Sequence, residues 1–231
     1  MFDGRWRGGI EKGLKPVGAK LRRTGITADM LTAFGILMAV AAAVAIGNGA
    51  LRAGLVLLVL TGVPDALDGA VAKAAGTASP RGAYFDSVSD RLTDALLFGG
   101  VGWYLATNEP GRISLLPFAV YAAAALVSYQ RAKADALGFD ARGGLMERAE
   151  RFVALAFGLL FSELLIAVLW VMLAATAATA GFRFVKVWRQ ASAPRPAPKR
   201  QRRQRRRAAR PIAQTWRTRA RDRSRARRAK P

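Results

Sequence analysis

Apolar residues are gathered into six long stretches, and this feature most limits how the chain can fold. Several stretches reach the roughly 20 residues that a helix needs to cross the hydrocarbon core of a bilayer. The fifth stretch is shorter and needs its flanking residues or a thinned bilayer to do so. The sequence therefore predicts an all-α integral membrane protein with six transmembrane helices, near residues 30–47, 51–72, 84–106, 113–134, 149–162 and 164–185.

Charge is distributed unevenly between the body and the end of the chain. Apolar residues make up 52% of the sequence, yet its formal charge is +22, and residues 192–231 hold 17 of the 37 Lys and Arg residues with one carboxylate, Asp222. Such a Pro- and Arg-rich segment cannot bury a core and is predicted to be disordered. We divide the chain into a juxtamembrane amphipathic helix (1–28), a six-helix transmembrane domain (29–190) and a disordered Arg-rich tail (191–231).

The remaining basic residues mark one side of the membrane. In the basic N-terminal segment, apolar residues recur at steps of three and four from Ile10 to Leu21, as in a helix lying on an anionic membrane face; a soluble amphipathic helix is the alternative. With six spans, one side carries 18 of the 20 basic residues of 1–191, and the other carries Arg52 and Arg112. The positive-inside rule predicts a multi-pass plasma-membrane protein with both termini in the cytoplasm.

Neither histidine nor cysteine occurs in the chain. Their absence removes the commonest general base, the commonest transition-metal ligand, disulfides and thiolate metal sites. Acid–base and metal chemistry must therefore use carboxylates, whose oxygen atoms favour hard ions such as Mg2+, Mn2+ or Ca2+.

Four carboxylates gather around the loop between the second and third apolar stretches. Ionisable residues in membrane spans are costly and are usually functional. Spacings of three and four place each pair on one helix face, and the mutual repulsion of four carboxylates is best relieved by divalent cations. Solvated carboxylates at helix ends are the alternative. The four are Asp65 and Asp68 at the end of the second stretch and Asp86 and Asp90 at the start of the third.

Two other functions fit parts of the sequence. A cation transporter would also use buried carboxylates, but these are expected near the middle of the membrane, whereas the four carboxylates lie at its cytoplasmic side. A membrane-anchored nucleic-acid-binding protein would use the Arg-rich tail, because Arg runs bind polyanions. For the tail we favour contact with anionic lipid over nucleic acid. The carboxylates at one side favour an enzyme that takes a soluble substrate from the cytoplasm and a lipid from the leaflet.

The spacing of the carboxylates resembles a known signature. Residues 65–73, followed by Gly82, Asp86 and Asp90, match the pattern D-x2-D-G-x2-A-R-x8-G-x3-D-x3-D of the CDP-alcohol phosphatidyltransferases at every step, with Lys73 in place of Arg. Lysine keeps the positive charge but loses the bidentate fork of arginine. This departure concerns contact with the nucleotide or phosphate and leaves the implied reaction class unchanged.

The resemblance implies a homodimeric enzyme that uses CDP-diacylglycerol and two Mg2+ or Mn2+ ions. As the fourth Asp of the signature, Asp90 would be the base that deprotonates the acceptor hydroxyl, and CMP would leave from the donor. The stretch around Asp29 also permits plain N-capping of the first span by Thr27 or Asp29, and the two roles are compatible. The implied metal ligands are Asp65, Asp68, Asp86 and Asp90, and the implied CDP-diacylglycerol contacts are Asp29, Thr32, Gly69, Lys73 and Ser79.

Basic residues on the same predicted side bear on the acceptor. They suggest a phosphorylated acceptor, and lipid-headgroup anchoring is the alternative. Residues 128–135 and 143–151 are similar to stretches of the actinobacterial phosphatidylinositol phosphate synthases, which implies inositol 1-phosphate as acceptor. Related stretches in phosphatidylglycerol phosphate synthases leave glycerol 3-phosphate as the alternative. Asp94, outside the signature, we interpret as a neighbour of the site or a partner of Arg91. The implied acceptor-phosphate ligands are Ser128, Arg131, Arg148, Arg151 and Arg183.

Overall fold

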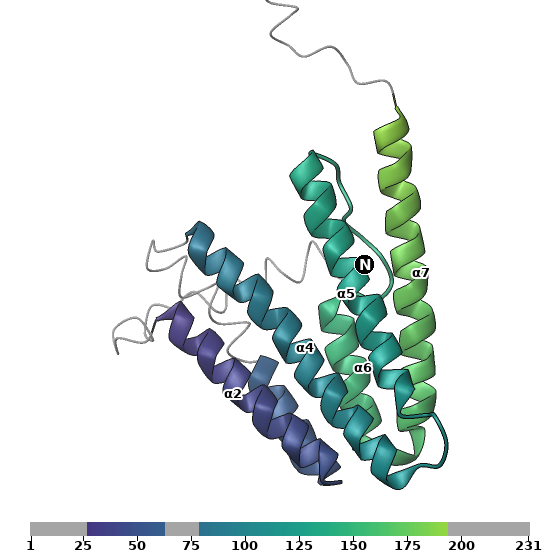
Figure 1. Ribbon diagram of the computed structural model, residues 1–231. Coiled ribbons are helices and arrows are strands. Elements are labelled where there is room, and N and C mark those ends of the chain that lie inside the picture. The colour runs from purple at the N-terminus through teal and green to yellow at the C-terminus, as the bar shows by residue number, and fades with distance from the viewer. Residues whose placement is uncertain (1–26, 63–78, 194–231) are drawn as a thin grey trace, which may run out of the picture. The chain divides into compact units, whose positions relative to one another are not determined.

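The computed structural model describes residues 27–62 and 79–193 of the chain, and these residues form helices and no strand. Contacts divide the chain into two units, Met1–Ala191 and Ser192–Pro231, and the helices lie in the first unit apart from the last residue of α7. The helices in chain order (Figure 1) are α2 (Ala28–Gly47), the helix Leu51–Gly62, α4 (Pro80–Asn108), α5 (Leu115–Leu137), α6 (Arg148–Leu160), a 3-10 turn (Ser162–Leu164) and α7 (Leu165–Ser192).

The predicted all-α fold class is confirmed for the described residues, because each of the six apolar stretches contains one of these helices. The second stretch is helical as far as Gly62. Residues 63–72 of that stretch lie outside the described residues, as do 1–26 and 194–231. The predicted interfacial helix and the predicted disordered tail therefore remain expectations.

Local sequence signals account for several helix ends. The Thr27 hydroxyl caps α2 by accepting a hydrogen bond from the backbone N–H of Met30 (3.2 Å), so the expected N-cap is present. The Ser79 hydroxyl caps α4 in the same way, and Pro80 occupies the first helical position, where its missing N–H costs nothing. At the far end of α5, Gly138 adopts a left-handed φ of 78°, which stops the helix.

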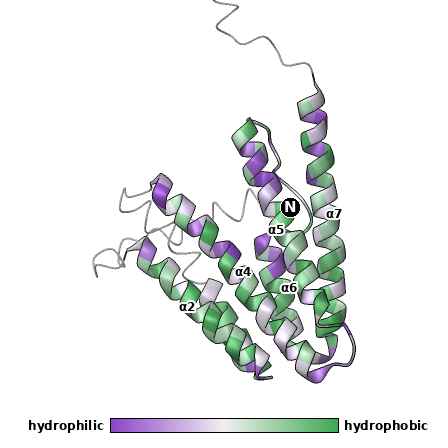
Figure 2. Cartoon of the chain, in the orientation of Figure 1, coloured by the Kyte–Doolittle hydropathy of each residue, from purple (hydrophilic) through white to green (hydrophobic). Residues whose placement is uncertain are grey.

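Successive helices of the bundle run in opposite directions (Figure 1). As a result, the first turns of α2, α4 and α6 lie at the same end as the last turns of α5 and α7. We call this the polar end, since the hydrophilic residues of α4, α5 and α7 gather towards it (Figure 2). Among the described residues, the arrangement brings together helix ends that the charge pattern assigned to one side of the membrane.

Small residues allow α2 and α4 to approach closely. Ala39 and Ala42 of α2 are fully buried, and a Cβ atom added to Gly100 of α4 would lie 2.6 Å from the backbone oxygen of Ala43. Close packing through small residues is typical of helices in membranes. Larger side chains complete the core, among them Ile46, Leu58, Leu97, Val101, Leu155, Leu169 and Met172.

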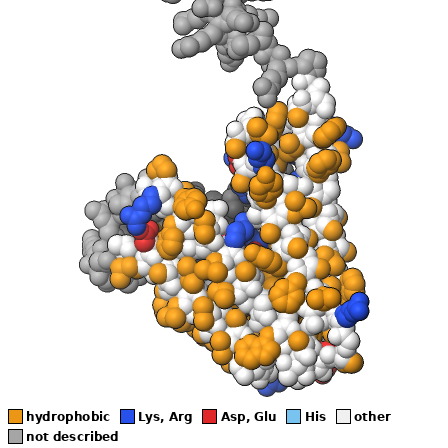
Figure 3. Space-filling model, viewed as in Figure 1, with side chains coloured by type: hydrophobic (Ala, Val, Ile, Leu, Met, Phe, Trp, Pro, Cys, Tyr) orange, Lys and Arg blue, Asp and Glu red, His pale blue; other side chains and the backbone are white. Residues whose placement is uncertain are grey.

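Much of the apolar surface faces outward. Among the described residues, α2 and the segment Ser162–Ser192 are long and apolar enough to cross a membrane, yet only 28% and 33% of their most apolar windows are buried. A core helix of a soluble protein would be mostly buried. Hydrophobic side chains are spread over the whole described part of the face seen in Figure 3, and so many exposed large apolar residues indicate contact with lipid. These features indicate a membrane protein.

Candidate active site

Two helix faces carrying opposite charges meet at the polar end. Asp86, Asp90 and Asp94 recur every four residues on α4, and Arg148 and Arg151 are three apart in the first turn of α6. Residues at these spacings share a helix face. Together, Asp90, Asp94, Arg148 and Arg151 form what we call the carboxylate–arginine cluster.

The cluster contains close ion pairs between the two helices. Arg148 Nη1 lies 2.7 Å from Asp90 Oδ1, and Arg151 Nη2 lies 2.9 Å from Asp94 Oδ2. Arg148 also reaches Asp94, with its Nε 3.7 Å from Oδ1. The prediction that Asp94 pairs with Arg91 is wrong. The partners of Asp94 come from α6, and Arg91 Nη2 instead lies 3.5 Å from Asp90 Oδ2.

Burial differs between the two halves of the cluster. The side chains of Asp94 and Arg151 are only 4% and 3% exposed, whereas those of Asp90 and Arg148 are 19% and 20% exposed. The inner pair is thus sealed from solvent, and the outer pair can be reached by a ligand. The Arg148 guanidinium also lies 5.0 Å from the centroid of the Phe152 ring, which adds a cation–π contact.

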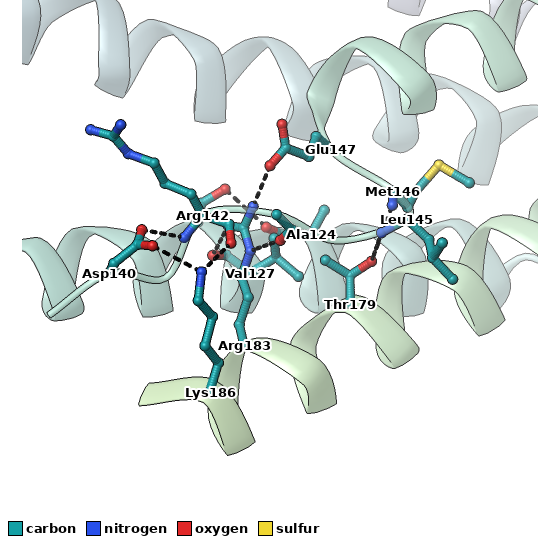
Figure 4. A network of polar contacts seen from close by, with 12 residues as sticks. Ala124, Val127, Asp140, Arg142, Leu145, Met146, Glu147, Thr179, Arg183 and Lys186 are labelled. Carbon is teal, nitrogen blue, oxygen red and sulfur yellow. Dashed lines mark hydrogen bonds and ion pairs between the residues drawn. The ribbon is translucent and has the colours of Figure 1, made fainter. Parts of the chain in front are cut away.

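A second polar network attaches the loop between α5 and α6 to α7 (Figure 4). We call it the α7 clasp, and its four α7 residues follow one face of the helix at steps of 4, 3 and 4. The Thr179 hydroxyl accepts from the backbone N–H groups of Leu145 and Met146, both at 3.1 Å. The remaining clasp residues of α7 are Arg183, Lys186 and Gln190.

Arg183 is the centre of the clasp. Its guanidinium donates to the backbone oxygens of Val127 and Gly143 (3.0 and 2.9 Å) and to Glu147 Oε1 (2.8 Å). The residue is 2% exposed. Three well-placed acceptors compensate for the loss of water around this buried charge. Since Glu147 precedes Arg148, this contact fixes the backbone at the point where α6 begins.

The outer part of the clasp involves Asp140. Lys186 Nζ lies 2.9 Å from Asp140 Oδ2, and the Gln190 amide exchanges hydrogen bonds with the backbone of Asp140. A hydrogen bond from the backbone N–H of Arg142, followed by one from Lys186, lowers the pKa of the Asp140 carboxyl below its ordinary value of 3.8. This part of the clasp therefore favours a charged carboxylate.

The loop conformation depends on Gly144. Its φ is +143°, and an added Cβ atom would overlap the methyl group of Thr179. Glycine alone occupies this backbone region without strain. The loop thus combines a backbone that requires glycine with side-chain hydrogen bonds from α7.

The predicted acceptor ligands fall into two groups. Ser128 and Arg131 on α5 and Arg148 on α6 are partly exposed, and Ser128 Oγ donates to the backbone oxygen of Ala124 (3.0 Å). Arg151 and Arg183 are buried and already hold carboxylate partners. Arg131 and Arg151 are close enough to Arg183 for their charges to repel it. Arginines from three helices therefore lie close to one another at the polar end.

Some of the predicted nucleotide contacts lie within the described residues, and others lie outside them. Asp29 Oδ2 accepts from Arg81 Nη2 at 2.9 Å, which joins the first turns of α2 and α4. Thr32 Oγ1 donates to the backbone oxygen of Ala28 (3.1 Å), and Ser79 caps α4. The other predicted ligands of nucleotide and metal, Asp65, Asp68, Gly69 and Lys73, lie outside the described residues.

Asp86 and Asp90 fit a site for a hard divalent ion. Both are partly exposed on one face of α4 and offer carboxylate oxygens, the donors that Mg2+ and Mn2+ prefer. Within 27–62 and 79–193, no group of three or more His, Asp or Glu residues that could hold a metal is found. The described carboxylates therefore supply half of the predicted donor set.

The clasp was missed by sequence reasoning, although a signal exists. Thr179, Lys186 and Gln190 are polar residues at helical spacing with Arg183 in a mainly apolar helix. That periodicity indicates one polar stripe. The partner loop carries Gly143 and Gly144, which predict an unusual backbone but do not reveal what it contacts.

A bundle of apolar helices with paired carboxylates and arginines at one end is consistent with a membrane-embedded enzyme. The sequence profile described as CDP-alcohol phosphatidyltransferase matches residues 25–182, so the chain belongs to the CDP-alcohol phosphatidyltransferase family. The predicted enzyme class is thereby confirmed.

Named relatives are similar over most of the helical region. A phosphatidylinositol phosphate synthase of Mycobacteroides abscessus is 36% identical over 64% of this chain and 68% of its own length. That of Mycobacterium marinum is 30% identical over 75% and 78%. An archaetidylinositol phosphate synthase of Methanothermobacter thermautotrophicus is 36% identical over 62% and 71%.

Solved structures agree with the fold. The crystal structure of Mycobacterium tuberculosis phosphatidylinositol phosphate synthase with CDP-DAG bound is 28% identical and superimposes with a TM-score of 0.72, covering 80% of this chain and 98% of that one. A structure of the same enzyme in complex with manganese and citrate has a TM-score of 0.71 at 29% identity, covering 76% and 88%.

Proposed function

We propose that this enzyme transfers the phosphatidyl group of CDP-diacylglycerol to inositol 1-phosphate, giving phosphatidylinositol phosphate and CMP. The relatives are phosphatidylinositol and archaetidylinositol phosphate synthases, and the similar crystal structure has CDP-DAG bound. The observation that carries the proposal is the 2.7 Å contact between Arg148 and Asp90. It sets a cation suited to a phosphate beside the carboxylate that we assign as the base.

The proposed roles follow from accessibility. Arg131 and Arg148 are partly exposed, and with Ser128 they contact the acceptor phosphate directly. The buried Arg151 and Arg183 contribute positive electrostatic potential to the acceptor-phosphate site. Asp29, Thr32, Gly69, Lys73 and Ser79 are the proposed contacts of the CDP group.

Asp90 is the residue that takes the proton in the proposed reaction. An acceptor whose phosphate is held by Arg148 would present a hydroxyl group to the neighbouring Asp90 carboxylate, which accepts the hydroxyl proton. The alkoxide oxygen attacks the β-phosphorus of the donor, and CMP leaves with the electrons of the broken P–O bond. Two divalent ions, Mg2+ or Mn2+, would bind to Asp65, Asp68, Asp86 and Asp90 and neutralise the diphosphate of the donor.

We also propose the membrane arrangement. All six helices span a plasma membrane, with the polar end and both termini in the cytoplasm, because the described helix turns at the polar end carry basic residues such as Arg81, Arg148 and Lys186. α6 has 13 residues, or about 20 Å of helix, so it crosses a core of about 30 Å only with its flanking residues. The enzyme works as a homodimer, and its Arg-rich tail contacts anionic lipid.

The test is CMP release by purified enzyme in detergent with CDP-diacylglycerol and Mg2+. Parallel reactions contain inositol 1-phosphate, glycerol 3-phosphate, free inositol or serine. We expect turnover with inositol 1-phosphate and loss of turnover when EDTA removes the metal. Turnover with glycerol 3-phosphate alone would overturn the proposed acceptor, and absence of CMP release with every acceptor, in folded protein, would overturn the donor as well.

A further inference from the structure

Asp94 has no role in the reaction as proposed. It lies one helical turn beyond Asp90, outside the signature of four carboxylates, and its side chain is 4% exposed. An ionised carboxylate at such depth is costly to bury. A buried ion pair is in addition weak evidence for stability, because apolar residues of similar volume often serve as well. Asp94 therefore calls for an explanation beyond packing.

Arg148 links Asp94 to Asp90, the residue that we assign as the base. Its guanidinium lies between two carboxylates, 2.7 Å from Asp90 and 3.7 Å from Asp94 by different nitrogen atoms. Arg151 occupies the other oxygen of Asp94 at 2.9 Å. Asp94 thus has one oxygen committed to a buried arginine and the other turned towards Arg148.

A divalent ion and the Arg148 guanidinium compete for Asp90. Both are cations that bind to the same carboxylate oxygens, and a cation at 2.7 Å opposes the approach of a second one. A carboxylate that shares Arg148 weakens this competition, because the guanidinium can turn towards it when Asp90 takes a metal. Removal of Asp94 would take away a carboxylate that draws Arg148 away from Asp90.

We propose that Asp94 is a positioning residue that holds Arg148 beside the site and thereby frees Asp90 for a divalent ion. The inference rests on the proposed function, because it takes Asp90 as a metal ligand. Arg151 holds Asp94 in place from the buried side, with its Nη2 2.9 Å from Oδ2. Arg91, on the same helix, also faces that carboxylate, with its Nη2 3.5 Å from Asp90 Oδ2.

The test measures Mn2+ binding to the full-length enzyme in detergent without substrates, by the electron paramagnetic resonance signal of free Mn2+. The decisive variant is Asp94→Asn with Arg151→Gln, which removes the buried pair without changing net charge. We expect its Kd for Mn2+ to rise about fivefold, a modest coupling between sites. Adding Arg148→Gln should return the Kd to the wild-type value or below.

A second variant keeps the proposal open to failure if the first does not fold. Arg148→Gln alone leaves the buried pair intact, and its Kd for Mn2+ should fall about threefold because the competing cation is gone. An unchanged Kd would overturn the proposal. A raised Kd in the double variant that persists after Arg148→Gln would also overturn it, since the effect would then not pass through Arg148.

Controls separate this inference from the proposed metal site. Asp90→Asn should weaken Mn2+ binding, and an unchanged Kd there would overturn the metal assignment itself. Loss of binding in Asp90→Asn together with a wild-type Kd in folded Asp94→Asn/Arg151→Gln would overturn the positioning role alone. Asp140→Asn removes a carboxylate from another ion pair and should leave the Kd unchanged.

Discussion

The carboxylate–arginine cluster and the α7 clasp are built from the same kinds of side chain but differ in what satisfies their charges. In the cluster, arginines face carboxylates, and Arg148 is shared between Asp90 and Asp94. In the clasp, Arg183 uses its donors on two backbone oxygens and one carboxylate. Side-chain partners can exchange when a ligand arrives, whereas backbone oxygens cannot leave without moving the chain.

Because of this difference, we regard the cluster as the candidate reaction site and the clasp as the structural network that sets the geometry of that site. The outer pair of the cluster, Asp90 and Arg148, is partly exposed, so a substrate or a metal ion can replace either side chain as the partner of the other. The clasp fixes the loop that leads into Arg148, so it determines where one half of the cluster lies. Substitutions in the cluster should therefore change binding and turnover, while substitutions in the clasp should mainly change stability.

The largest expected effect is on turnover in the cluster. Asp90→Asn replaces the proposed base by an amide that cannot accept the proton and is a poorer metal ligand, so CMP release should fall by about 10^3-fold or more. Thermal unfolding of the variant should stay close to that of the wild type. Substantial activity in Asp90→Asn would show that Asp90 is not the base. It would also contradict the proposed functional difference between the cluster and the clasp.

The next effect is on stability in the clasp. Arg183→Met leaves Glu147 and two backbone oxygens without their donor, and we expect a loss of about 3–5 kcal/mol in unfolding free energy. Urea or thermal denaturation in detergent measures it. Arg183→Lys is the matched control, because it keeps the ion pair with Glu147 and should lose less. Equal stability of wild type and Arg183→Met would show that the clasp does not fix the loop.

Glycines in the same loop offer a finer comparison. Gly138 has a φ of +78° and open space around it, whereas Gly144 has a φ of +143° and faces Thr179. Gly138→Ala should cost about 1–2 kcal/mol from the backbone alone, and Gly144→Ala should cost more because the new methyl group also meets Thr179. Denaturation curves of the two variants give the comparison directly. A larger loss in Gly138→Ala would contradict the assigned packing of the loop on α7.

The sequence alone predicts some features of the molecule better than others. The helices were predictable because long apolar stretches leave few alternatives, and the predicted start at 84–106 missed the four residues from Pro80 because a Ser-Pro cap carries no hydrophobic signal. The family was predictable because a fixed spacing of carboxylates along the chain survives any change in tertiary packing, while the roles of Asp86 and Asp90 stay predictions.

Contacts between helices were not predictable in the same way. Asp94 was interpreted as a neighbour of the site or as a partner of Arg91, and its partners come from α6, more than 50 residues away. Local spacing cannot show which face of a distant helix will lie opposite. The basic character of Arg151 and Arg183 was recognised, yet their burial against acidic partners depends on that pairing of faces and could not be inferred.

The smallest expected effect is on the melting temperature and comes from the Asp140 carboxylate in the outer part of the clasp. The Asp140 carboxyl has a pKa below 3.8 in the folded protein because the Arg142 N–H and Lys186 bind its charged form. A carboxyl with a depressed folded-state pKa stabilises the fold above its unfolded-state pKa, and this contribution is lost as the pH falls through the folded-state value. The melting temperature of the wild type should therefore exceed that of Asp140→Asn slightly at pH 6, and the difference should shrink as the pH is lowered below 3.8. Using the difference between the two proteins cancels the protonation of all other carboxylates. A gap that stays constant down to pH 3 would mean that Asp140 acts in the clasp through its backbone contacts with Gln190 and not through its charge.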